Sequence, residues 1–215
     1  MRRIALIGVC TAIAVAAAGA SSASAKSLQL STSEGPLLPG AQLSLLSGKV
    51  LQSSEGSVEC PTSVLLGTLL SNGASKDRVS ITAGPATGPH GVLCTSTTSL
   101  GSVEVQAGGL PWTQEFTVTG KAKLKGKKKL SLTVTVPAFL DAQCTYEAPS
   151  LAESFTVGPV GVAQPLAVTI ASQTFSRSAS SNPLCPATVT AGASTVSIAA
   201  YGPGGTLQPV SATRR

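Results

Sequence analysis

The chain contains few of the residues from which enzyme active sites are built. Its 215 residues include a single histidine, His90, and charged residues make up only 11% of the total. It contains no Gly-x-Ser-x-Gly elbow, phosphate-binding glycine loop or calcium loop with spaced carboxylates. We therefore expect a protein that is not an enzyme and has no catalytic residue and no cofactor. The alternative is a cryptic secreted hydrolase that brings His90 together with a serine and Asp77 or Asp141.

A long apolar run occurs only once, at the N-terminus. Arg2 and Arg3 precede an apolar stretch from Ile4 to about Ala20, and the small residues Ala23-Ser24-Ala25 follow it. This order predicts a signal peptide, residues 1–25, that is cleaved after Ala25. The mature chain then has no transmembrane segment, and we expect it to be secreted. A retained N-terminal anchor is the alternative, because the run is almost long enough to cross a membrane.

Closely spaced cysteine pairs, which are typical of zinc sites, are also missing, so we expect no metal. Once Cys10 leaves with the signal peptide, four cysteines remain, namely Cys60, Cys94, Cys144 and Cys185. An even number in an exported chain predicts two disulfides. Three pairings are possible, and we favour Cys60 with Cys94 and Cys144 with Cys185, which are local in sequence.

Aromatic residues are scarce at 3%, and small or β-branched residues dominate instead. Nine segments mostly alternate apolar and polar side chains, as half-buried strands do: residues 41–46, 63–70, 78–82, 102–106, 115–124, 129–136, 153–157, 165–170 and 194–201. Turns rich in glycine and proline separate them. The pattern predicts an all-β fold, an antiparallel β-sandwich that is immunoglobulin-like or related.

We expect residues 26–215 to form a single all-β domain whose ordered core spans about residues 40–201. Two immunoglobulin-like halves that meet near residue 110 are the alternative. The sequence CPTSV at Cys60 is echoed by CPATV at Cys185, but the match is too short to establish a repeat.

Positive charge is concentrated in the segment KAKLKGKKKLSL, which supplies Lys121, Lys123, Lys125, Lys127, Lys128 and Lys129. Alternation predicts a hairpin between residues 115–124 and 129–136, with Gly126 at its bend and the lysines on its polar side. We expect a solvated tip that limits edge-to-edge association of strands. Contact with anionic cell-envelope polymers or lipid headgroups is the alternative. Nucleic acid is not expected, because the aromatic residues lie on the buried face.

The only tryptophan, Trp112, has two interpretations. It can pack in the core and brace a loop, as a lone tryptophan in a sandwich usually does. It can instead be a platform on which a sugar or another flat ligand stacks, together with the adjacent loops. The second interpretation makes the chain a secreted sugar- or small-ligand-binding module.

Short motifs around the cysteines resemble a known group of proteins. These are Cys60-Pro61, Cys94, Leu110-Pro111-Trp112, Cys144-Thr145-Tyr146 and Cys185-Pro186. Their layout is similar to that of uncharacterised small secreted proteins of high-GC Gram-positive bacteria, over roughly residues 55–190. The resemblance implies export, disulfides and β structure, and it carries no catalytic residue. We therefore expect a secreted, non-catalytic structural or binding module of the cell exterior whose partners are unknown.

Overall fold

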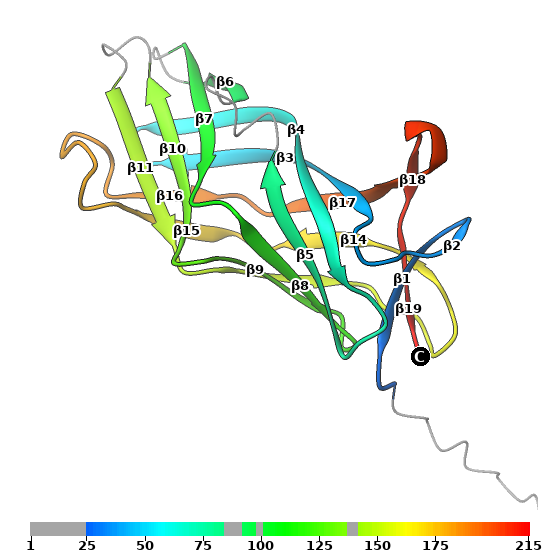
Figure 1. Cartoon of the computed structure of the whole chain (residues 1–215). Helices are drawn as coiled ribbons and strands as arrows, with labels where there is room; N and C mark the ends of the chain where they lie inside the picture. Colours follow the sequence, from blue (N-terminus) through cyan, green and yellow to red (C-terminus); the bar gives the residue numbers. More distant parts are fainter. Residues whose placement is uncertain (1–24, 84–91, 98–100, 137–141) are drawn as a thin grey trace, which may run out of the picture.

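The structure is a computed structural model of the whole chain, and it describes residues 25–83, 92–97, 101–136 and 142–215 (Figure 1). Residues 1–24 of the expected signal peptide 1–25, together with His90 and Asp141 of the alternative triad, lie outside the described residues. Regular structure within the described ranges is antiparallel strand, apart from one short 3-10 helix, η3 (Pro203–Gly205). The all-β class is therefore confirmed. None of the described residues belongs to a helix that is long and apolar enough to span a membrane.

Eight strands form a first closed sheet, which we call ring 1. In order around the ring they are β3 (Gln42–Ser53), β4 (Gly56–Ser71), β5 (Lys76–Ala83), β8 (Trp112–Thr117), β9 (Lys121–Gly126), β12 (Leu151–Phe155), β14 (Ala167–Ile170) and β17 (Ser194–Tyr201). The ring closes because β17 pairs with β14 on one side and with β3 on the other. Each strand of ring 1 therefore has two hydrogen-bonded neighbours.

Eight strands also form a second closed sheet, ring 2, which uses β3 and β4 again. Its other members are β6 (Val92–Ser96), β7 (Ser102–Gly108), β10 (Leu130–Val136), β11 (Ala142–Ala148), β15 (Gln173–Arg177) and β16 (Thr188–Ala191). Closure comes from β16, which pairs with the second half of β3.

The long β3–β4 hairpin is the wall that the two rings share, and Figure 1 shows its two strands crossing the molecule. The first half of β3, residues 43–46, pairs with β17 of ring 1, and residues 51–52 pair with β16 of ring 2. A register shift between Ser47 and Lys49 separates the halves, as expected where a bulge bends a strand. This pairing differs from the two separate sheets of the predicted immunoglobulin-like sandwich.

A small four-stranded sheet lies at one end of the molecule. It consists of β1 (Leu28–Thr32), β2 (Gly35–Pro36), β13 (Gln164–Pro165) and β19 (Ser211–Arg214), while β18 (Leu207–Pro209) extends ring 1 beside β17. Leu28, Leu30 and Ala212 are fully buried in this region. Strands therefore extend beyond the expected range of about 40–201 at both ends. The backbone N–H groups of Lys26 and Ser27 donate to the carbonyl of Arg215, at 2.8 and 2.9 Å, so both ends of the described chain lie together.

The buried apolar side chains form one cluster that runs through both rings. This cluster results from the alternation of apolar and polar residues along the strands. In β7 and β8 every second residue is buried, because successive side chains of a strand face opposite sides. Phe116 and Phe155 meet edge to face inside ring 1, with ring centroids 5.6 Å apart.

Both disulfides lie in ring 2, and the favoured pairing is confirmed. Cys60 of β4 is bonded to Cys94 of β6, with 4.3 Å between the Cα atoms. Cys144 of β11 is bonded to Cys185, which lies in the loop between β15 and β16, with 5.7 Å between the Cα atoms.

The predicted lysine hairpin is wrong, because β9 and β10 do not pair. Strand β9 lies between β8 and β12 in ring 1, whereas β10 lies between β7 and β11 in ring 2. The predicted strand 115–124 is broken by a turn at Gly120, which has a φ of +76° and whose N–H donates to the carbonyl of Thr117 at 3.1 Å. This turn folds β9 onto β8, and β12 occupies the other edge of β9.

Candidate functional site

The lysine-rich segment is divided between two places. Lys121, Lys123 and Lys125 project outward from ring 1, because Ala122 and Leu124 between them are buried. The remaining three, Lys127, Lys128 and Lys129, are exposed in the link from β9 to β10. Since β9 has hydrogen-bonded neighbours on both sides, its lysines do not protect a sheet edge, and that expected role loses its basis.

Two further cations lie on the same outer surface of ring 1, and sequence reasoning missed both. Lys76 and Arg78 are exposed on β5, which is separated from β9 by β8 alone. Glu115 of β8 lies directly opposite Arg78 on one side and Lys123 on the other. Side chains that oppose each other across neighbouring strands project from the same face. We call Lys76, Arg78, Lys121, Lys123 and Lys125 together the basic face.

One carboxylate stands among these five cations. Glu115 Oε1 accepts hydrogen bonds from Lys125 Nζ at 3.0 Å and from Arg78 Nε at 3.2 Å. The hydrogen bond from Lys125 lowers the pKa of Glu115, as do the charges of Lys125, Arg78 and Lys76, although partial burial opposes them. Glu115 therefore stays ionised and relieves part of the repulsion, while the face keeps an excess of positive charge.

One lysine of the link contacts the other ring. Lys129 Nζ donates to Glu147 Oε2 of β11 at 2.6 Å. Gly126 allows the link to turn tightly, because a Cβ there would lie 2.4 Å from the carbonyl oxygen of Lys129. The six lysines thus do not form the single cationic tip that the sequence suggested.

Trp112 does not offer an exposed ring for stacking. It is 5% exposed, and its indole N–H donates to the carbonyl of Gly108 at 2.9 Å. Its side chain lines a cavity of about 80 Å³ that residues of both rings enclose. Gln114 also lines this cavity, and its Nε2 donates to Glu153 Oε2 at 2.5 Å. This volume is well below the roughly 300 Å³ at which typical ligand pockets begin. Trp112 is therefore not the exposed stacking platform that the ligand-binding interpretation requires.

Asp77 is fully buried at the start of β5. Its Oδ1 accepts a hydrogen bond from the N–H of Ala74 at 3.2 Å, while its Oδ2 has no hydrogen-bond partner among the residues that the structure describes. Burial raises the pKa of Asp77 to about 6, although hydrogen bonds from the backbone of Ala74 and Gly73 act in the opposite direction. The geometry assigns this carboxyl to shaping the turn before β5.

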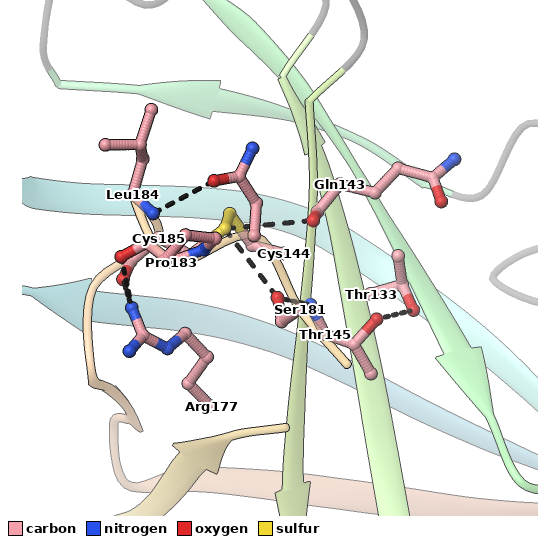
Figure 2. Close-up of a disulfide and its surroundings, with 10 residues drawn as sticks. Thr133, Gln143, Cys144, Thr145, Arg177, Ser181, Pro183, Leu184 and Cys185 are labelled. Atoms are coloured by element: carbon pink, nitrogen blue, oxygen red, sulfur yellow. Dashed lines mark hydrogen bonds between the residues drawn. A yellow bond between two sulfur atoms is a disulfide. The ribbon is translucent and has the colours of Figure 1, made fainter. Parts of the chain in front are cut away.

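The Cys144–Cys185 disulfide holds a loop at the end of ring 2, and Figure 2 shows its contacts. Arg177 Nη1 donates to the carbonyls of Pro183 and Cys185, both at 2.5 Å. The N–H of Leu184 donates to the side-chain oxygen of Asn182 at 2.9 Å. This network fixes Leu184 in the loop even though its side chain is 91% exposed.

No group of three or more potential metal ligands occurs in residues 25–83, 92–97, 101–136 and 142–215. The resemblance to secreted, disulfide-containing proteins of high-GC Gram-positive bacteria remains a prediction. Comparison of the chain with protein-family models, curated proteins and solved structures found no match.

Proposed function

We propose that the chain is a secreted, non-catalytic binding module of the cell exterior that adheres to anionic envelope polymers through its basic face. Export is supported by the N-terminal pattern that ends at Ala25. The two disulfides support it as well, because such bonds persist mainly in oxidising compartments.

The observation that carries the proposal is the arrangement of five cations on β5 and β9, the two strands that flank β8. Alternate residues along a strand are about 6.8 Å apart, and β5 and β9 are separated by two strand spacings of about 4.8 Å each. Charges on such a grid can contact several phosphates or carboxylates of an extended polymer at once. Many weak contacts made together bind more tightly than any one of them alone.

Hydroxyl groups on the same face support a polymer rich in oxygen. Thr117 lies opposite Lys76, Thr113 lies opposite Lys125, and Ser154 lies opposite Lys121. The aromatic residues of β8, Trp112 and Phe116, are buried on the inner side of that strand. Stacking on nucleobases from β8 is therefore not available, which favours a polymer without bases.

Matched charge removals test this proposal. One variant replaces Lys121, Lys123 and Lys125 by glutamine, and the control replaces Lys127, Lys128 and Lys129 in the same way. A lysine near an anionic surface contributes about 1 kcal/mol, so the face variant should bind immobilised poly(glycerol phosphate) on the order of a hundredfold more weakly. The control should lose less than about tenfold, and binding of the parent chain should fall as salt rises, because salt screens exposed charges.

Equal losses in the two variants would mean that net charge alone matters and that the basic face is not the site. Binding to vesicles of anionic lipid but not to the polymer would replace the proposed partner by a membrane surface. If the parent chain ignores both surfaces at low salt, the adhesion proposal fails.

A further inference from the structure

Ring 2 encloses a hollow of about 390 Å³. Its wall is mainly apolar and includes Leu51, Val58, Val103, Val134, Val136 and Val189. Eight strands close around an interior that is either filled by side chains or large enough for one small ligand. An apolar cavity of about 150 Å³ already takes up benzene, so this hollow has room for a body of two fused rings.

The hollow follows from the composition of the strands around it. The inward residues of β10 and β16 that line it are valines, and β11 contributes Ala142 beside Cys144. Tyr146 is the one aromatic residue among the described residues of its wall. The cavity beside Trp112, by contrast, which residues of both rings line, has a volume of only about 80 Å³.

Tyr146 places a polar group at this apolar wall. The residue is 3% exposed, and its ring is part of the wall of the hollow. Burial raises the pKa of Tyr146, although the charge of Arg177 opposes this, so the hydroxyl stays protonated at neutral pH. A hydroxyl group at an otherwise apolar wall favours a ligand that brings a hydrogen-bond acceptor.

Several exposed or half-buried residues line one end of the hollow, three of them polar. Ser53, Glu55 and Asn182 line it together with Leu184. Leu184 lies in the loop that the Cys144–Cys185 bond and Arg177 hold in place, as Figure 2 shows. The carboxylate of Glu55 disfavours an anionic ligand, and the apolar wall disfavours a strongly charged one of either sign.

We propose that ring 2 binds one small, uncharged, largely apolar molecule that carries a hydrogen-bond acceptor. The apolar body lies against the valines, and the acceptor accepts a hydrogen bond from the hydroxyl of Tyr146. This site shares no residue with the basic face, so the two proposals stand or fall separately.

Prodan, a neutral naphthalene ketone whose emission moves to the blue in apolar surroundings, is a suitable probe. Titration of the purified chain with prodan should give a saturable blue shift. Tyr146→Phe removes only the hydroxyl and should weaken binding about threefold to tenfold, the effect of one neutral hydrogen bond. Val189→Trp fills part of the hollow and should weaken it by at least about tenfold.

The matched control is Thr188→Trp, because Thr188 is the exposed neighbour of Val189 on the same strand and faces outward. It should bind prodan like the parent chain. Equal effects of the two tryptophan variants, full affinity in Tyr146→Phe, or no saturable shift in the parent chain would each overturn the proposal. If Val189→Trp fails to fold, the comparison of Tyr146→Phe with the parent chain decides.

Discussion

Asp77 carries a buried charge at neutral pH, and this makes stability depend on pH. Its pKa is raised from 3.8 to about 6, so the folded chain holds this proton more tightly than the unfolded chain does. The contribution of Asp77 to stability is therefore greatest below about pH 4 and is lost as pH rises to about 6, by on the order of 3 kcal/mol. Urea unfolding across this range should show the fall, and Asp77→Asn should remove it.

Comparing the pH dependence of stability in the parent chain and in Asp77→Asn separates the effect of Asp77 from that of the other carboxyl groups. Glu115 has a lowered pKa, so its contribution to stability is lost as pH falls below its ordinary value of 4.5, which is the opposite trend. It is present in both chains and cancels in their difference. Parallel pH profiles for the parent chain and Asp77→Asn would show that the folded pKa of Asp77 is not raised.

For single elements, alternation predicted which side of a strand is buried but not which strands pair. Ala122 and Leu124 are buried and Lys121 and Lys123 are exposed, as expected. The partner of β9 depends on the turn at Gly120 and on contacts with residues far along the chain. The alternation of apolar and polar residues carries no information about either. Short strands such as β16 (Thr188–Ala191) offered too few alternating residues to be seen.

Gly120 decides the pairing of β8 with β9. A Cβ there would lie 2.6 Å from the carbonyl oxygen of Phe155, and its φ of +76° is unfavourable for other residues. Gly120→Ala should therefore destabilise the fold by about 2 kcal/mol or more in chemical denaturation. Gly161→Ala is the control, because Gly161 has a φ of +81° but no heavy atom within 4 Å of its Cβ position.

The control isolates the cost of the backbone conformation, which should be about 1 kcal/mol. A loss in Gly120→Ala no larger than that in Gly161→Ala would mean that the close approach of Phe155 does not limit this turn.

At the scale of the whole molecule, the sequence predicted strands and both disulfides but not the two closed rings. Closure rests on the pairing of β17 with β14 and β3, and of β16 with β3. These partners are far apart in sequence, and the β3–β4 hairpin serves both rings by bending between Ser47 and Lys49. The basic face could not be foreseen for the same reason, since it needs β5 beside β8 and β9.

The shared hairpin should make the two rings unfold together. Trp112 is a buried residue of β8 in ring 1, and Tyr146 of β11 is the only tyrosine of ring 2. In a Tyr201→Phe background, tryptophan fluorescence and the near-ultraviolet signal of Tyr146 should therefore change at the same denaturant concentration. Coincident transitions are the mark of a single cooperative unit. Two separated midpoints would show that one ring survives without the other.

Lys26 and Arg215 lie side by side, so the order of the strands along the chain can be changed by circular permutation. Their backbones are hydrogen-bonded, so a few residues would be enough to join them. A circular permutant, whose chain begins at another residue, would then keep the same strands and the same strand pairings. The exposed glycines of η3, Gly204 and Gly205, have open space around them and offer such a point. What defines this fold is the set of strand pairings, and the position of the chain ends is incidental to it.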